Sequence, residues 1–335
     1  MTLALVVAAA MFVGILAYAL FGGADFGSGF YDLTAGGSRG GAALRTQIDH
    51  SIGPVWEANH VWLVYVLVIW WTAFPTAFAA TMNTLIIPML LALLGIVLRG
   101  ASFVFRKYAA TLAQARVFGI VFAGSSLITP FFLGAVVGAI ASGRVPIEGR
   151  GDLIGSWVTP TSIIGGVVAV GTCSFLAGVF LVADAARAGS VDLEHRLRRT
   201  TIGVGVATGM IVLGALVPLR DDAPTLVEGL QGRAAPLVVV SALAGLGTLL
   251  LLGGRRYAAA RVTAVVAVAA VVAGWGVGQY PWMLVDELRI EEAAGASATL
   301  EALLVVVGLA GVLVLPSLAY LYRLTQTEPW AHSSH

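Results

Sequence analysis

Long apolar runs, separated by short polar or glycine-rich stretches, dominate the pattern of this chain. A helix that crosses a membrane needs about 20 apolar residues, and nine runs approach or exceed that length. None shows the ten-residue alternation of a membrane β-barrel strand. The pattern therefore predicts an all-α polytopic membrane protein with about nine transmembrane helices. The predicted spans are 3–22, 55–73, 76–98, 117–141, 158–183, 201–219, 234–253, 261–279 and 300–322.

Two breaks between these runs carry structural information. The second and third runs are divided only by the Ala73-Phe74-Pro75 corner, which predicts a tight helical hairpin. The longest polar interval, 23–53, follows Gly22 and contains further glycines near its start. Such glycines favour close approach of backbones at a helix end. Within the interval, the polar residues 44–51 predict a short amphipathic helix at the membrane surface.

Composition agrees with a membrane protein. The chain is 59% hydrophobic and 11% charged, whereas a soluble domain carries about 25% charged residues. The net charge of +1 gives no indication of a nucleic-acid partner. A single cysteine, Cys173, excludes an internal disulfide and a thiolate metal cluster built by this chain alone. No interval could hold a soluble domain, so we expect one transmembrane domain over 1–326 and a flexible cytoplasmic tail over 327–335.

The basic residues predict an orientation. Of the 19 lysines and arginines, 14 belong to loops one, three, five and seven and the C-terminal tail, and 5 belong to the alternate loops. Cytoplasmic loops carry the excess of basic residues in membrane proteins. We therefore expect the N-terminus outside the cell membrane and the C-terminus in the cytoplasm. This arrangement requires an odd number of spans, in agreement with nine.

The second run opens with a concentration of polar groups. Glu57, Asn59 and His60 lie within four residues, directly before a long apolar stretch. Pro54 suits the first turn of a helix, where its missing N–H is not needed. In such a helix Glu57 and His60 share one face, and Trp56 lies one turn from His60. Ionisable residues inside a span usually mark an ion path, a proton path or a ligand site. The alternative, favoured for Asn59, is that these groups satisfy nearby backbone.

Asp25 and Arg99 are the other candidates. Asp25 lies at the cytoplasmic end of the first run between glycines, where it either caps a turn or shapes a cation site or a proton entrance. Arg99 ends the third run, and we expect its side chain to extend to the membrane interface. Pairing of Arg99 with Asp25, or with a partner chain, is the alternative.

Counting possible ligands argues against a cofactor held by this chain alone. Glu57-x-x-His60 matches one element of a di-iron bundle, which needs a second such element and two more glutamates. A haem held by two histidines needs both at membrane depth, and His60 is the one histidine so placed. We therefore expect no metal and no haem ligands here, and any redox cofactors in another subunit.

Several motifs together resemble subunit II of cytochrome bd-type quinol oxidases. They occur in that family's order and spacing, and they cover spans one to three and eight, whereas spans four to seven match mainly in hydropathy. The motifs are Ala24-Asp25-Phe26-Gly27-Ser28-Gly29, Gly53-Pro54-Val55-Trp56-Glu57-Ala58-Asn59-His60-Val61-Trp62, Phe74-Pro75, Leu98-Arg99-Gly100 with Phe103 and Arg106, and Gly278-Gln279-Tyr280-Pro281.

The resemblance implies a haem-free subunit of an enzyme that oxidises quinol and reduces oxygen to water. Two four-helix bundles and a peripheral helix are expected. The partner, subunit I, would hold two haems b and one haem d together with the quinol-oxidising loop. Small single-helix accessory subunits are further candidates, all within the lipid bilayer. Such enzymes do not pump protons; they draw protons for oxygen from the cytoplasm and release those of quinol outside.

The resemblance also assigns roles to residues. It implies that Glu57 helps protons enter from the cytoplasm. Asn59, His60 and Asp25 are our further candidates for this proton pathway. Many members have Asp-Gly-Asn-Gln where this chain has Glu57-Ala58-Asn59-His60, so the acid is kept and the role of His60 is open. The remaining motif residues are expected to be structural: Gly53, Pro54, Trp56 and Arg99.

A secondary transporter is the alternative function. Many spans with few buried charges fit that class, and Pro88 and Pro130 could break helices at the midplane. No clear paired repeat is visible in the sequence.

Overall fold

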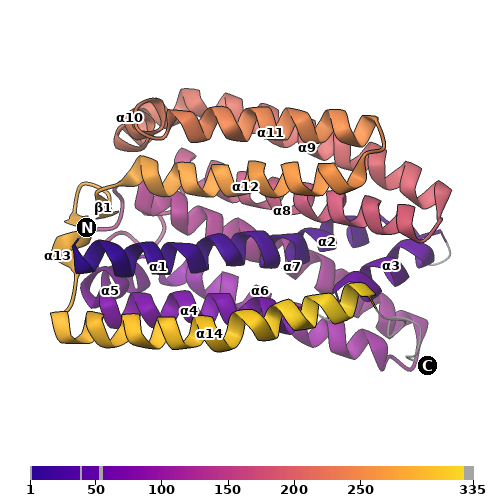
Figure 1. Cartoon of the computed structure of the whole chain (residues 1–335), viewed down its shortest axis with the longest axis horizontal. Helices are drawn as coiled ribbons and strands as arrows, with labels where there is room; N and C mark the ends of the chain where they lie inside the picture. The colour runs from indigo at the N-terminus through magenta and orange to yellow at the C-terminus, as the bar shows by residue number, and fades with distance from the viewer. Residues whose placement is uncertain (1, 38–39, 53–55, 328–335) are drawn as a thin grey trace.

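Long helices run side by side between the two ends of the molecule (Figure 1). The structure is a computed structural model that describes residues 2–37, 40–52 and 56–327, except for the side chains of 52, 56, 57, 322 and 324–327. Its elements are α1 (Leu3–Ala17), the π-helical η1 (Tyr18–Gly22), α2 (Gly23–Leu33), α3 (Ala42–Ile52), α4 (Trp56–Ala73), α5 (Pro75–Thr84), α6 (Ile86–Lys107), α7 (Leu112–Ala141), α8 (Pro160–Arg187), α9 (Val191–Asp222), α10 (Pro224–Gln231), α11 (Ala235–Gly253), α12 (Tyr257–Gln279), β1 (Trp282–Leu284), β2 (Leu288–Arg289), α13 (Ile290–Ala293) and α14 (Ser297–Thr327).

The predicted all-α polytopic fold is confirmed. Over the described residues, eight helices are long and apolar enough to cross a membrane, and nine if the bent pair α4–α5 is counted as one span. Threonine side chains start several of them: Thr111 and Thr159 each accept a backbone N–H of the first turn of α7 and α8. The antiparallel pair β1–β2 is a small addition at one end. The predicted amphipathic helix is present as α3.

The first span is longer than predicted. We expected it to end at residue 22 in a glycine-rich loop, but the chain stays helical from Leu3 to Leu33 through η1 and α2. The glycines are tolerated because they allow close packing. A Cβ on Gly27 would lie 1.9 Å from the carbonyl oxygen of Cys173 in α8, and one on Gly29 would lie 2.3 Å from the Cβ of Ser126 in α7. The predicted close backbone approach is therefore correct, within a helix rather than a loop.

The third span begins later than predicted. We expected one helix over 76–98, folded back from α4 as a tight hairpin. Instead α5 leaves α4 at a bend of 115°, and α6 starts at Ile86. Pro88 explains the break, because its ring would clash with the carbonyl four residues earlier, at Thr84, in a continuous helix. The prediction of a tight hairpin is therefore wrong. The short helix α5 is separate from α6 and lies at the same end of the molecule as α10 and α13 (Figure 1).

Two large hydrophobic clusters, and a small third one around Ala141, Ala223 and Leu226, hold the helices together. One is centred on α2, α8, α9 and α12 and includes Leu44 and Ile48 of α3. The other joins α1, α4 and α5 with the end of α7 and the β1–β2 hairpin. The last helix, α14, packs on α1 and α4 and exposes most of its apolar surface, as the expected peripheral helix would. The predicted tail begins at the last residue of α14, and its remainder, 328–335, lies outside the described residues.

Candidate functional site

Asp25 and Arg99 form a buried ion pair between α2 and α6. Nη2 of Arg99 lies 3.0 Å from Oδ1 of Asp25, and each side chain is 2% exposed. The same nitrogen donates a hydrogen bond to the backbone oxygen of Asp25 at 3.3 Å. The expectation that Arg99 extends to the interface is wrong, and the alternative pairing is correct. Asp25 caps no turn either, because the helix continues around it.

Two aromatic rings lie close to the cation of this ion pair. The guanidinium carbon of Arg99 lies 4.9 Å from the ring centre of Phe26 and 5.3 Å from that of Phe122. Such contacts attract a desolvated cation to the ring faces. An internal carboxylate and two rings give Arg99 more favourable contacts than the membrane interface would, which is the physical reason for its position.

Two predicted residues of α4 complete the cluster. Asn59 is buried, and its side-chain amide donates to the carbonyl of Phe21 at 3.3 Å. The His60 ring is centred 6.0 Å from that of Phe26. His60 also lines an apolar groove of about 480 Å³ between α4 and α14. The structure thus brings together Asp25, Asn59, His60 and Arg99, four of the predicted site residues.

The remaining candidates are at the edge of the described chain. Gly53 and Pro54 lie outside the described residues. Trp56 and Glu57 form the first turn of α4, and the positions of their side chains are not described. The helix nevertheless places Glu57 three residues before His60, which puts them on neighbouring positions of one face.

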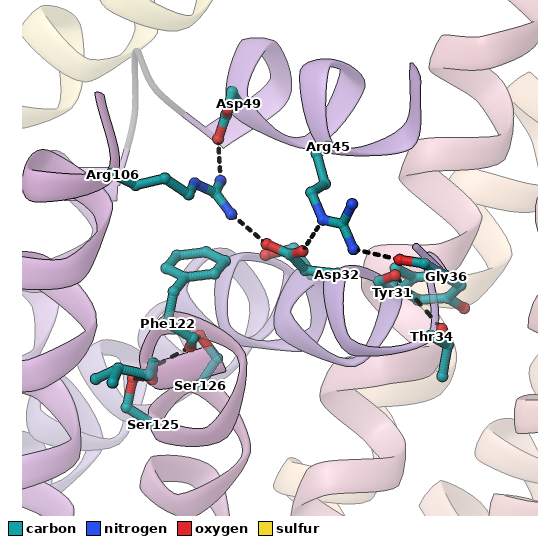
Figure 2. A network of polar contacts seen from close by, with 12 residues as sticks. Tyr31, Asp32, Thr34, Gly36, Arg45, Asp49, Arg106, Phe122, Ser125 and Ser126 are labelled. Carbon is teal, nitrogen blue, oxygen red and sulfur yellow. Dashed lines mark hydrogen bonds and ion pairs between the residues drawn. The ribbon is translucent and has the colours of Figure 1, made fainter. Parts of the chain in front are cut away.

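A second polar network, which the sequence analysis did not identify, lies nearer to α3. Figure 2 shows Arg106 between the carboxylates of Asp32 and Asp49, with Arg45 on the other side of Asp32. Nε of Arg45 donates to Asp32 Oδ1 at 2.8 Å, and its Nη2 donates to the carbonyl of Gly36 at 2.7 Å. This network fastens α3 to α2 and α6.

One sequence signal could have revealed both networks. Asp25 and Asp32 are seven residues apart on α2, and Arg99 and Arg106 are seven apart on α6. Seven residues are about two helical turns, or roughly 10 Å. Matched spacing of acids on one helix and arginines on another predicts two ion pairs in register. The arginines are long enough to reach α2 past Phe122 of α7, whose ring centre lies 4.9 Å from the Arg106 guanidinium.

Asp49 is the most accessible acid of the second network. Its side chain is 33% exposed, whereas that of Asp32 is 3% exposed. Partial burial raises the pKa of Asp49 above its usual range, against the lowering effect of Arg106. The second network thus places an accessible carboxyl of α3 next to Asp32, which lies seven residues after Asp25 on α2. Carboxyl groups in such an arrangement can attract and hold protons.

The Gly278–Pro281 motif is structural. Nε2 of Gln279 donates to the carbonyls of Trp282 and Met283 at 3.3 and 3.2 Å, which holds the start of the β1–β2 hairpin. A Cβ on Gly229 would lie 2.0 Å from the Gly278 oxygen, so α10 packs tightly on the end of α12. Among the described residues, no group of three or more His, Cys, Asp or Glu side chains could hold a metal ion.

Comparisons with known proteins agree with this architecture. The family model for cytochrome bd terminal oxidase subunit II matches residues 3–325. A curated relative, cytochrome bd ubiquinol oxidase subunit 2 of Bacillus subtilis (strain 168), is 30% identical over 223 residues, which are 65% of this chain and 62% of the relative. The matched part thus spans less than two thirds of that relative.

A solved structure shows the same fold. The structure of bd oxidase from Geobacillus thermodenitrificans contains a chain that matches with a TM-score of 0.77 and 24% identity, over 97% of this chain and 98% of that one. The transporter alternative is not supported, because the oxidase family model matches nearly the whole chain. The chain belongs to the cytochrome bd terminal oxidase subunit II family.

Proposed function

We propose that this chain is the haem-free subunit II of a cytochrome bd-type complex that oxidises quinol and reduces oxygen to water. The family match over residues 3–325 carries the proposal. Subunit I is the partner and holds two haems b, haem d and the quinol-oxidising site. Small single-helix subunits are further candidate partners. The single transmembrane domain over 1–326 stays a prediction.

Within this complex, the chain guides protons from the cytoplasm toward the oxygen-reducing haem. Glu57 at the start of α4 takes up and gives up the proton, and His60 and Asn59 assist it. The Asp25 charge, which Arg99 holds in place at 3.0 Å, makes the passage of a proton through the low-dielectric interior less costly. Trp56, Gly53 and Pro54 shape the start of α4. The N-terminus lies outside and the C-terminus in the cytoplasm.

Replacing Glu57 by Gln tests the proton role. We expect quinol oxidase turnover of the purified complex to fall by about 100-fold, as when a proton-transferring group is lost, with intact haem spectra. Glu301→Gln is the matched control, because Glu301 is exposed near the start of α14, at the opposite end from the start of α4. Unchanged turnover in the Glu57 variant would remove the proton role. A purified chain without any haem-bearing partner would contradict the assignment to an oxidase.

A further inference from the structure

The first membrane span contains an irregular turn next to the buried cluster. Residues Tyr18–Gly22 form a π-helix between α1 and α2. Single π-helical turns within α-helices are rare and often occur at functional sites. The ring of Tyr18 lies close to Gly22. A Cβ at position 22 would be only 3.0 Å from Tyr18 Cε2. The π turn and Gly22 together determine where this tyrosine lies.

The hydroxyl of Tyr18 differs from those of the other buried or half-buried tyrosines. It is buried and has no hydrogen-bond partner among the described residues. By contrast, the Tyr31 hydroxyl lies 3.1 Å from Thr201 Oγ1, and that of Tyr65 donates to the Ala10 carbonyl at 3.0 Å. A buried hydroxyl without a protein partner is normally satisfied by an ordered water.

Tyr18 faces the candidate proton-handling cluster. Its ring centre lies 6.1 Å from that of His60 and 6.2 Å from that of Phe26. The Phe26 ring in turn lies 4.9 Å from the guanidinium carbon of Arg99, so Tyr18 lies beside the Asp25–Arg99 pair. Nε of Arg99 is also buried and without a hydrogen-bond partner among the described residues. Both carboxylate oxygens of Asp25 are likewise buried without a hydrogen-bond partner among the described residues, apart from the ion pair with Arg99. A carboxylate has about four lone-pair sites, so Asp25 can accept a hydrogen bond from water.

We propose that Tyr18 is a further positioning residue of this site, which binds internal water between the Tyr18 hydroxyl, Nε of Arg99 and the Asp25 carboxylate. A buried water needs two to four polar partners, and these three groups supply a hydroxyl, a donor and an acceptor. The Asp25 charge stabilises a proton in transit on this water. The hydroxyl fixes the orientation of the water and keeps its own proton throughout. The proposal rests on the proposed proton-guiding function.

Titratable and charged groups reach this position from several elements. They are Asp25 of α2, His60 of α4, Arg99 of α6 and Cys173 of α8. Tyr18→Phe leaves all four in place and removes one oxygen atom. A changed pH profile in that variant therefore reports on how the water couples these groups, rather than on the loss of a titrating residue.

The test compares Tyr18→Phe with Tyr31→Phe in the purified complex. Tyr31 lies in the same span, and its hydroxyl has the protein partner that Tyr18 lacks. For Tyr18→Phe we expect an unchanged melting temperature, and turnover lower by about tenfold, part of the roughly 100-fold that a full proton-transfer group contributes. Its pH profile should shift, and its solvent deuterium isotope effect should grow. For Tyr31→Phe we expect a lower melting temperature with wild-type turnover, pH profile and isotope effect.

Asp25→Asn, measured in parallel, distinguishes a failure of this inference from a failure of the proposed proton-guiding function. If Asp25→Asn slows turnover while Tyr18→Phe matches the wild type in turnover, pH profile and isotope effect, this inference is wrong and the proposed function stands. If Asp25→Asn has no effect, Asp25 loses its role in the proposed function, and this inference fails with it. A high-resolution density map of the complex gives a second measurement. Water density in contact with the Tyr18 hydroxyl supports the inference, and a protein side chain bonded to that hydroxyl overturns it.

Discussion

Asp25 and Arg99 show how a membrane helix bundle keeps two charges away from water. The ion pair replaces part of the lost hydration, and the rings of Phe26 and Phe122 contact the cation. Removing one member of a buried pair leaves an uncompensated charge, which typically costs about 3–5 kcal/mol. Replacing both members by apolar residues removes that penalty. The energetic role of each residue therefore depends on the presence of the other.

A double-mutant cycle follows from this dependence. Arg99→Leu and Asp25→Leu should each lower the free energy of unfolding of the complex by about 3–5 kcal/mol. The variant with both changes should lose less than either one alone. Denaturant titration of the purified complex measures all three. Arg144→Leu is the control, because Arg144 is 48% exposed in its pair with Asp222 and should cost less than about 1 kcal/mol. Additive losses at Asp25 and Arg99 would contradict the coupling.

At this scale, the sequence predicted which residues are unusual better than where they lie. Asp25, Asn59, His60 and Arg99 were all selected, and the structure places them together. The predicted position of the Arg99 side chain was wrong because this side chain is long enough to reach either the membrane interface or an internal acid. The choice depends on the α2–α6 register, which the apolar pattern of a single run does not contain. The equal spacing of the two acids on α2 and the two arginines on α6 does indicate this register.

At the scale of elements, length and hydropathy placed the apolar part of each regular helix but not its polar turns, since α9 begins at Val191 and not at residue 201. They also failed where glycine or proline decides. The span predicted over 234–253 matches α11 almost residue for residue. The first span was ended too early, because glycine is read as a helix breaker although here it permits contact between helices. The break before α6 was missed because Pro88 lies inside an apolar run. In the first case the prediction lacked the position of the neighbouring helix, and in the second it lacked the local backbone conformation.

Gly27 tests the contact between α2 and α8. Gly27→Ala would place a methyl group 1.9 Å from the Cys173 carbonyl oxygen, so the two helices must separate. Overpacking of this kind typically costs about 1–3 kcal/mol, and we expect a clear fall in the melting temperature of the complex. Gly124→Ala in α7 is the matched control, because nothing lies within 4 Å of the position that the added methyl group would take. Equal melting temperatures for the two variants would show that α2 and α8 are not tightly packed.

At the scale of the whole molecule, the connections lie at two ends. The start of α1, α5, α10 and α13 lie at one end, and α3 and the turn between α11 and α12 lie at the other (Figure 1). The alternation of basic and acidic loops could be read from the sequence, since topology controls it directly. The proposed haem-bearing partner could be inferred only from the family resemblance, because the apolar pattern of one chain does not identify the subunit that it binds.

Cysteine labelling of intact cells tests the proposed orientation of the whole chain. Oγ of Ser51 in α3 donates to Asp184 of α8 at 2.9 Å, so the start of α4 with Glu57 lies at the same end as the α8–α9 turn. In that turn Ser190 is exposed, and at the other end of α8 Glu148 is exposed. A membrane-impermeant maleimide should label Glu148→Cys in intact cells, and Ser190→Cys only after permeabilisation. The wild type should stay unlabelled, because Cys173 lies within α8, with its sulfur close to Gly23 of α2. The reverse pattern would place Glu57 at the outer surface, and proton uptake from the cytoplasm could not begin there.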